Sequence, residues 1–395
     1  MNYCEMIMVD GIDNHNKVYT MEQINDDQFK ASWGRYGATL STKIYSMNIW
    51  DTVRKQKLNK GYTDITKMKS VITQAVNAYA PIEDKLISDL VGRILSYAND
   101  CIRKNYRIKK QDVTKEMIVS AKKTLRDLDC LVSMGCDANE FNRTLEKLFC
   151  IIPRRMSNVA DYLAKSKNDY REIIERETSL LNVMSSMAGA DDENTPDTEK
   201  TILDAFGLTI RPCKEKENCK IKEKLTNESA DKFACAFRIS NQKCENRFNE
   251  YVKKHNISKR DIHFFWHGTR NANVWGIYKE GMLLNPNAVV TSRMFGYGLY
   301  FATRAKKSIG YSSLDGYWSK ETADEGFLFV MKVAYKCPKV FYIHENWMNK
   351  ITGNDIWKQG YDAVFASKDR GMLVNDEIIV YDEAQVCPRY LVVLK

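Results

Sequence analysis

The sequence predicts a multidomain α+β protein, and three observations lead to this fold class. Apolar residues follow helical spacing across residues 71–189, as they do in amphipathic helices. After residue 200 the chain breaks into short segments rich in aromatic and β-branched side chains, which is typical of strands. Between the two patterns lies an acidic, polar stretch with one proline, residues 191–200, which predicts a linker or an exposed loop.

Composition excludes several classes of protein. The chain has 395 residues, of which 44% are hydrophobic and 28% charged, an ordinary globular balance for about two to four domains. It has no run of about 18 apolar residues, and residues 1–16 lack the cationic and apolar regions of a secretory signal. The 11 cysteines include no Cys-x-x-Cys pair, so we expect reduced thiols and no zinc ribbon.

Residues 30–69 are both basic and aromatic. They hold nine Lys or Arg against two acids, which is most of the formal charge of +9 on the whole chain. Basic side chains neutralise phosphates and aromatic rings stack on exposed bases, so this stretch is a candidate nucleic-acid surface. A solvated lysine face over a small aromatic core accounts for the same composition, and both interpretations stay open.

Four apolar stripes predict four helices in the middle of the chain. The stripes run over residues 82–95, 117–128, 141–149 and 173–184. Pro153 ends the third, because proline cannot continue a helix. Good helix formers dominate and no stripe carries a metal-binding pair, so we expect these helices to pack as an all-α bundle.

The last part of the chain is predicted to be a mainly β domain of the α+β class. Its strand-like segments are residues 234–239, 262–266, 327–335, 340–343, 363–366, 377–381 and 390–394. Several of them are apolar enough to be central in a sheet. One helix-like stretch, residues 273–279, is followed by Gly281, where a glycine commonly ends a helix.

Two segments of this domain carry candidate functional residues, each with a structural alternative. A predicted strand ends in His267, Gly268 and Thr269, and the glycine lets a ligand approach the backbone closely. A histidine at a strand end is also common as a structural residue. Farther along, Tyr300 and Tyr311 are spaced so that their rings can flank a flat ligand from both faces, or they can be two core tyrosines.

A third segment begins with Glu377, which opens an otherwise apolar strand. Burying a carboxylate without a partner is costly. Glu377 is therefore either open to water at the strand end or hydrogen-bonded within a site, and this segment alone favours neither.

Together and in this order, the segments resemble the poly(ADP-ribose) polymerases, members of the diphtheria-toxin-like ADP-ribosyltransferase superfamily. The matching motifs are His267-Gly268-Thr269, Gly298-Leu299-Tyr300-Phe301-Ala302, Lys307-Ser308 with Tyr311, and Glu377-Ile378-Ile379-Val380-Tyr381-Asp382 with Ala384-Gln385-Val386. The resemblance implies a catalytic triad at His267, Tyr300 and Glu377. It also implies that residues 191–395 form an ADP-ribosyltransferase catalytic domain of two packed antiparallel sheets.

The resemblance extends upstream of this domain. The hexapeptide Ser32-Trp33-Gly34-Arg35-Tyr36-Gly37 is similar to the signature of the WGR domain, a small nucleic-acid-sensing module. This implies a small β-rich WGR-like domain at residues 1–72. Residues 73–190 lie where the family keeps its regulatory helical domain, and Phe149-Cys150-Ile151-Ile152-Pro153 is similar to the end of one of its helices.

The family resemblance implies a function and a set of site residues. The function is NAD+-dependent protein poly(ADP-ribosyl)transfer that releases nicotinamide and needs no metal. Residues implied to bind NAD+ are His267, Gly268, Thr269, Asn273, Tyr300, Lys307, Ser308 and Tyr311, and Met294 is implied to line the acceptor pocket. Trp33 and Arg35 are implied to contact DNA breaks or other nucleic-acid ends, which would activate the enzyme in a DNA-damage response.

The implied partners are NAD+, nucleic-acid ends and acceptor proteins, including the chain itself, with no membrane. The expected location is nuclear in a eukaryote and cytosolic otherwise, and the protein is not expected to be secreted. Transfer of single ADP-ribose units and a catalytically silent nucleic-acid-binding adaptor stay open as alternatives.

Two departures from the family pattern leave finer points open. Leu283 and Leu284 stand where the family often has a cationic residue, and Asn375 stands two residues before Glu377, where tyrosine is frequent. The affinity for NAD+, the length of the product chains and their branching are therefore not predicted.

Overall fold

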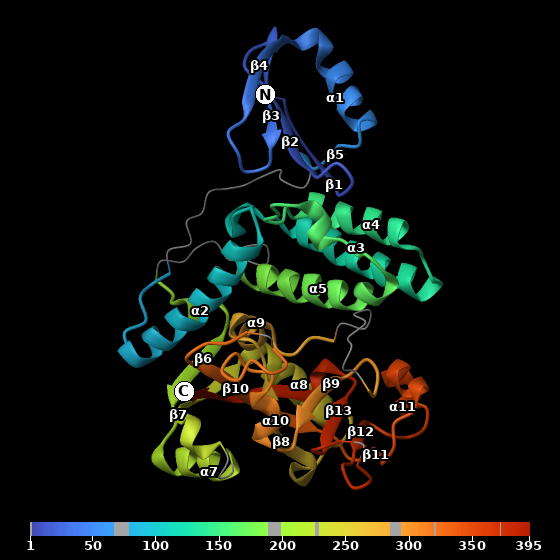
Figure 1. The fold of residues 1–395 in the computed structure, drawn as a ribbon. Coiled ribbons are helices and arrows are strands. Elements are labelled where there is room, and N and C mark those ends of the chain that lie inside the picture. The colour runs from blue at the N-terminus through green and yellow to red at the C-terminus, as the bar shows by residue number, and fades with distance from the viewer. Residues whose placement is uncertain are drawn as a thin grey trace. The chain divides into compact units, whose positions relative to one another are not determined.

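The computed structural model describes residues 2–66, 79–188, 199–225, 229–284, 294–319, 321–371 and 373–395 (Figure 1). The chain forms two compact units. The first takes in Met1–Ala75, Asp100–Glu193 and Asn287–Thr291, and the second takes in Val76–Asn99, Asn194–Pro286 and Ser292–Lys395. The boundaries predicted at residues 72 and 190 lie outside the described residues, so the division into three domains stays a prediction.

The first unit begins with a five-stranded antiparallel sheet in the order β4-β3-β2-β1-β5 (Figure 1). Its elements are β1 (Tyr3–Asp10), β2 (His15–Gln23), β3 (Gln28–Arg35), β4 (Ser41–Ser46), α1 (Trp50–Asn59) and β5 (Thr63–Asp64). Along β3, Phe29 and Ala31 are buried whereas Gln28 and Lys30 are exposed, as in a sheet with one solvated face. Trp50 of α1 covers the buried face, with its ring centroid 5.0 Å from that of Phe29.

The four helices predicted from the apolar stripes are present. They are α2 (Lys85–Asn105), α3 (Lys115–Met134), α4 (Ala138–Ile151) and α5 (Tyr170–Met187). Thr114 caps α3 by accepting a hydrogen bond from the N–H of Met117, and Gly135 ends the helix in a left-handed conformation with φ 84°. Helix α3 packs against both α4 and α5. The role of these helices as a regulatory domain stays a prediction.

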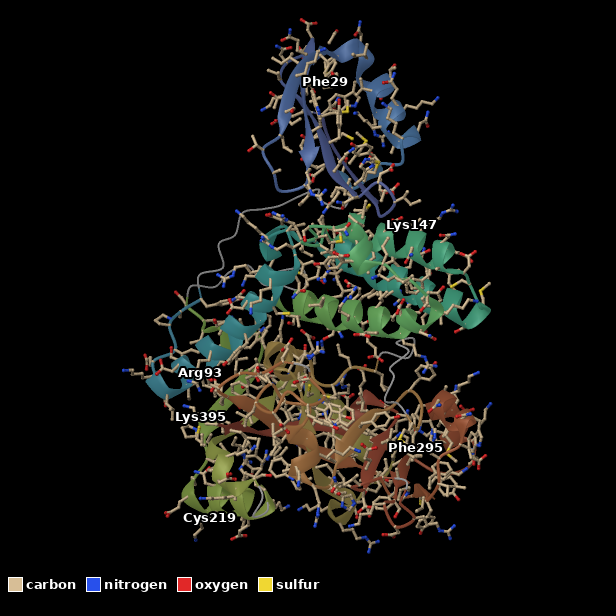
Figure 2. The ribbon with its side chains drawn as sticks, in the orientation of Figure 1. Phe29, Arg93, Lys147, Cys219, Phe295 and Lys395 are labelled. Atoms are coloured by element: carbon tan, nitrogen blue, oxygen red, sulfur yellow. The ribbon has the colours of Figure 1, made fainter. Side chains whose placement is uncertain are left out.

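Helix α2 is divided between the two units, because its residues up to Asn99 belong to the second. Arg93 Nε lies 3.0 Å from Glu325 Oε1, and the Tyr97 hydroxyl donates to the same oxygen at 3.1 Å. Only 6% of Glu325 is exposed. Since a buried carboxylate without partners is costly, Arg93 (labelled in Figure 2) and Tyr97 stabilise the packing of α2 in the second unit.

The second unit is built on nine strands in the order β11-β12-β13-β9-β8-β10-β14-β7-β6 (Figure 1). They are β6 (Leu208–Pro212), β7 (Phe233–Asn241), β8 (Ile262–Gly268), β9 (Leu299–Ala302), β10 (Gly326–Ala334), β11 (Pro338–Phe341), β12 (Ala363–Ala366), β13 (Glu377–Val380) and β14 (Val386–Leu394). The helices of this unit, besides the start of α2, are α6 (Ile202–Ala205), α7 (Glu215–Leu225), α8 (Gln242–Lys254), α9 (Val274–Glu280), α10 (Ala305–Ile309) and α11 (Gly353–Trp357).

This sheet differs from the predicted pair of packed antiparallel sheets in two ways. Its two halves are joined into one sheet by a single residue pair, Trp266 of β8 with Ala302 of β9. Strand β9 has only four residues, so it overlaps β8 at one end only. Strands β11 and β12 pair in parallel. This pairing is possible because the connection between them, which contains α11, is long enough to return the chain to the same end of the sheet.

The predicted strands of this unit are found within a few residues of their expected places. The segment 363–366 coincides with β12, whereas the segment 340–343 begins two residues after the start of β11. The helix predicted before Gly281 is α9, and this glycine has φ 83°. Helix α8 was not predicted, although its buried residues Cys244, Phe248 and Tyr251 follow helical spacing. No described helix is both long and apolar enough to cross a membrane.

Replacing Arg93 by alanine leaves the Glu325 carboxylate buried with one donor fewer. We expect the second unit to lose about 1–3 kcal/mol of unfolding free energy, the cost of an unsatisfied buried polar group. Urea denaturation measures this loss, and hydrogen exchange shows whether the amides of α2 become less protected. The matched control is Arg103→Ala on the same helix, whose pair with Asp100 is exposed and contributes little. Equal losses from both variants would contradict the anchoring role of Arg93.

Candidate active site

Three neighbouring strands bring the predicted triad together. Strands β13, β9 and β8 lie side by side in the sheet (Figure 1), and they carry Glu377, Tyr300 and His267 respectively. Glu377 pairs with Ala302 across β13 and β9, and Trp266 pairs with the same alanine across β9 and β8. Residues that the sequence presents in three separate motifs are therefore neighbours in the fold.

His267 is neutral in this site. Its Nδ1 lies 3.3 Å from the carbonyl oxygen of Tyr300, and because a carbonyl only accepts, Nδ1 carries the proton and Nε2 keeps its lone pair. Burial lowers the pKa of His267 to about 4, against the opposing effect of the hydrogen bond to Tyr300, since the imidazolium would lose its hydration. Nε2 is thus able to accept a hydrogen bond from a ligand hydroxyl.

The phenol of Tyr300 is fixed by the chain that precedes β9. Its oxygen accepts from the N–H of Phe295 (labelled in Figure 2) at 3.0 Å, and its hydroxyl donates to the carbonyl of Gly296 at 3.0 Å. Gly296 has φ 74°, and a Cβ there would lie 2.0 Å from the carbonyl oxygen of Ile351. The turn therefore requires glycine. Because the Tyr300 hydroxyl is hydrogen-bonded to this turn, the path of the turn sets the position of the Tyr300 side chain.

Glu377 is buried and paired. Only 8% of the residue is exposed, and its Oε1 forms an ion pair with the ammonium group of Lys307 on α10. Of the two interpretations that the sequence left open, the structure favours the partnered carboxylate over one open to water. Lys307, which the family resemblance implied as an NAD+-binding residue, is a direct partner of the predicted catalytic acid.

Two motifs meet where β8 ends. A Cβ at Gly268 would lie 1.7 Å from the carbonyl oxygen of Ser308, so only glycine fits without a backbone shift. Ser308 lies on α10 and is buried. The side-chain amide of Asn273 donates to the hydroxyl of Thr269 at 3.1 Å, which stabilises the turn that follows the strand. The expected binding of NAD+ by these four residues stays a prediction.

Tyr311 lies just after α10 and stacks on Trp318, with ring centroids 6.1 Å apart. Burial, together with the nearby charge of Glu377, raises the pKa of Tyr311, so its hydroxyl keeps its proton at neutral pH. The enclosure of a flat ligand ring between Tyr311 and Tyr300 stays a prediction. Met294 is half-buried and packs against the hydrophobic cluster that contains Phe295.

Two contacts of the turn after β8 were not predicted from the sequence. Arg270 Nε donates to the carbonyl of Ser319 at 3.0 Å, and the side-chain amide of Asn271 donates to the carbonyl of Glu325 at 2.9 Å. Their only sequence signal is that both follow the His267 motif directly. The contacts tie this turn to the segment between α10 and β10.

Trp33 and Arg35, the predicted nucleic-acid contacts, lie on β3 in the first unit. The ring of Trp33 stacks on that of Tyr19, with centroids 6.0 Å apart. Arg35 donates to the carbonyl oxygens of Asn14 at 3.1 Å and Ser157 at 2.8 Å. Both side chains therefore have structural partners, and their contact with nucleic acid stays a prediction.

One group among the described residues has the ligands for a metal ion. Ligand atoms of Asp10, Asp13 and His15 lie within 4.8 Å of one another, at the turn between β1 and β2. Asp10 Oδ1 already accepts from the backbone N–H of Ile12 at 2.7 Å. In the described part of β8, β9 and β13 no such group occurs.

The close contact between Gly268 and Ser308 predicts that two glycine-to-alanine variants change the free energy of unfolding in opposite directions. Gly268→Ala drives a methyl group into a backbone carbonyl, so we expect a loss of about 1–3 kcal/mol in unfolding free energy from overpacking. Gly92→Ala, on α2, has nothing within 4 Å of its Cβ and should stabilise by up to about 1 kcal/mol through helix propensity. Urea denaturation of both variants measures the difference. A Gly268→Ala protein as stable as the parent would show that the backbones do not touch.

The low pKa of His267 predicts a pH dependence of stability. Because the folded-state pKa of about 4 lies below the ordinary 6.5, the unfolded chain binds the proton more tightly. The stabilisation is therefore complete above about pH 6.5 and is lost as the pH falls toward 4. An NMR titration of the imidazole Hε1 signal should show no step for His267 between pH 5.5 and 8. A step near pH 6.5 would mean that the ring is open to water.

Comparison with known proteins supports the predicted family for the second unit. Residues 215–395 match the family model of the poly(ADP-ribose) polymerase catalytic domain. The chain is 31% identical over 186 residues to the uncharacterized protein 101L of Invertebrate iridescent virus 6, an alignment that covers 47% of this chain and 76% of the viral protein.

Two poly(ADP-ribose) polymerases align over nearly the whole chain. Poly [ADP-ribose] polymerase 1 of Gallus gallus is 23% identical over 458 residues, covering 98% of this chain and 44% of its own length. The protein of the same name from Caenorhabditis elegans is 24% identical over 463 residues, covering 97% of this chain and 48% of its own length. The chain thus spans less than half the length of either polymerase. It is related to the poly(ADP-ribose) polymerases through a catalytic domain of that family.

Proposed function

We propose that the chain is an NAD+-dependent protein ADP-ribosyltransferase that extends ADP-ribose into chains. The observation that carries the proposal is the position of His267, Tyr300 and Glu377 on three adjacent strands, within the domain that matches the polymerase family. The neutral histidine and the buried, paired glutamate have the chemistry that NAD+ cleavage needs. The acceptors are proteins, including the chain itself, and then the growing ADP-ribose chain.

NAD+ would be bound at the meeting point of β8 and α10. The backbone of Gly268 and the hydroxyl of Ser308 hold the nicotinamide carboxamide, because these two residues already touch. Tyr300 and Tyr311 enclose the nicotinamide ring by stacking. His267 accepts a hydrogen bond at Nε2 from a hydroxyl of the adenine-side ribose, since its Nδ1 is directed to the carbonyl of Tyr300.

The reaction breaks the bond between the nicotinamide nitrogen and the anomeric carbon of the ribose. The electron pair of that bond leaves with nicotinamide, so positive charge develops on the ribose. A carboxylate placed where this charge develops stabilises the transition state, commonly the largest catalytic effect. Lys307 engages Oε1 of Glu377, which leaves Oε2 to bond the ribose 2′-hydroxyl and to take the proton of the acceptor hydroxyl as its oxygen bonds to the anomeric carbon.

Nucleic-acid ends are the activator that we propose, acting through the first unit in a DNA-damage response. The support is the basic charge of residues 30–69 and the bonds of Arg35. Because Arg35 donates to the carbonyl of Ser157 beyond α4, a phosphate that bound this guanidinium would compete with that bond and favour a different state of the segment. The matching location is the nucleus of a eukaryote, or otherwise the cytosol.

The test of this function is Glu377→Gln with labelled NAD+, in the presence and absence of nicked DNA. The amide keeps the shape of the carboxylate but neither accepts the proton nor balances positive charge. We expect chain elongation to fall by about 10²–10⁴-fold, the usual contribution of a general base, while NAD+ binding measured by calorimetry changes little. Glu250→Gln on the exposed face of α8 is the matched control and should elongate normally.

The products of the parent protein separate the alternatives. High-molecular-weight ladders that increase with nicked DNA support the proposal. A single shifted band would show that the protein transfers single ADP-ribose units. If no label were incorporated under any condition, the chain would be a catalytically silent nucleic-acid-binding adaptor. If the Glu377→Gln variant made chains as long as those of the parent, Glu377 would not have the proposed catalytic role.

A further inference from the structure

The ring of Tyr311 packs against an aromatic residue that lies outside the four sequence motifs. Trp318 stacks on it in an offset arrangement, at an interplanar angle of 20° and with ring centroids 6.1 Å apart. Within the described ranges, no hydrogen bond fixes the Tyr311 hydroxyl. The orientation of the Tyr311 ring therefore depends on how the ring packs, and Trp318 is the aromatic ring against which it lies.

Trp318 is itself fixed to the segment that carries Tyr311. Its backbone N–H donates to the carbonyl of Gly310 at 2.8 Å. A Cβ at Gly310 would lie 3.0 Å from Cδ1 of the indole, so the indole lies directly over the backbone of this glycine. The ring of Tyr317 meets the indole edge-on, with centroids 4.7 Å apart. Trp318 is thus held by a backbone hydrogen bond, a close contact with Gly310 and a second ring.

The loop that presents Trp318 is tied down where it ends. The hydroxyl of Ser319 donates to the carbonyl of Ser312 at 2.9 Å, which closes the loop on itself. The carbonyl of Ser319 accepts from Arg270 Nε at 3.0 Å, in the turn that follows the His267 motif. The part of the fold that carries the candidate NAD+ site therefore also sets the position of Trp318.

The exposure of Trp318 argues against a role in the hydrophobic core. The residue is 58% exposed, so it buries much less apolar surface than a core tryptophan does. Adjacent exposed rings also occur on surfaces that bind a partner, and Tyr317 is exposed as well. The contacts of the indole with Gly310 and Tyr311, however, are directed to the candidate site, which favours a role there.

We propose that Trp318 is a positioning residue for the nicotinamide end of NAD+. It packs on one face of the Tyr311 ring and holds that ring in the orientation in which its other face stacks on nicotinamide. This inference rests on the proposed NAD+-dependent activity. Because such stacking acts on bound NAD+ before the bond breaks as well as during the reaction, loss of Trp318 should raise KM for NAD+ more than it lowers kcat.

The experiment measures benzamide binding to the full chain by calorimetry, because benzamide is an aromatic ring with the same carboxamide as nicotinamide. We expect Trp318→Ala to weaken binding about 2- to 12-fold, the contribution of one stacked aromatic pair. Trp318→Phe keeps a ring against Tyr311 and should retain most of the affinity. The matched control is Trp357→Ala, which should bind like the parent. Trp357 is 44% exposed and lies over Gly353 of α11, where a Cβ would meet its Cη2 at 2.6 Å.

A double-mutant cycle shows whether Trp318 acts through Tyr311. Once Tyr311→Ala has removed the ring, Trp318→Ala should cause no further loss of benzamide affinity. Equal losses in both backgrounds would overturn the positioning role, since Trp318 would then act on the ligand directly or through the fold as a whole. A Trp318→Phe variant that binds as weakly as Trp318→Ala would overturn it too.

This inference and the proposed function fail in different ways. If the parent binds benzamide and Trp318→Ala weakens that binding, but no nicotinamide is released from NAD+, the proposed function is overturned and the positioning role stands. If the parent releases nicotinamide and Trp318→Ala matches it in both benzamide affinity and KM, only the positioning role is overturned. A parent that binds no benzamide would overturn the stacking site on Tyr311, and this inference with it.

Discussion

The burial of one carboxylate organises the centre of the second unit. Glu377 is held inside the sheet, and Lys307 supplies the positive charge that a buried carboxylate needs. Lys307 lies on α10, and the next residue, Ser308, touches the backbone of Gly268. The strand residue before that glycine is His267. The ion pair thus fixes α10 against β13, and the contact of Ser308 with Gly268 places the same helix against β8, so the groups expected to hold NAD+ and to cleave it are linked through α10.

The chain before β9 provides the second fixed point of this centre. Tyr300 bonds the backbone on either side of the Phe295–Gly296 peptide, and Tyr381 donates to the carbonyl of Phe295 at 2.6 Å. Burial raises the pKa of Tyr381 well above its ordinary value, so this donor stays protonated. The same short segment therefore positions the Tyr300 side chain and supports the hydrophobic cluster that contains Phe295. A change in the packing of this cluster would reach the Tyr300 phenol through these hydrogen bonds.

The sequence was informative where function depends on residues close together in the chain. The four motifs were enough to indicate the family of the second unit, and helical periodicity placed α2 to α5. It could not show what depends on residues far apart. The pair of Arg93 with Glu325 joins positions on different elements, and neither side chain has a local signal. The single pair that merges the two halves of the sheet depends on where β9 ends relative to β8, which spacing does not determine. The function of the basic stretch stayed ambiguous, because Trp33 packs against the core of its sheet and Arg35 donates hydrogen bonds to carbonyls that are far away in the sequence.

The division of α2 has a consequence for how the protein can be taken apart. Each unit consists of segments separated in sequence, so no continuous piece of the gene encodes either one alone. A fragment that begins after residue 200 lacks Tyr97, whose ring meets that of Phe327 at 6.2 Å, and exposes an otherwise fully buried phenylalanine to water. A fragment of this chain that begins after residue 200 therefore has to cover the freed face of Phe327 in another way.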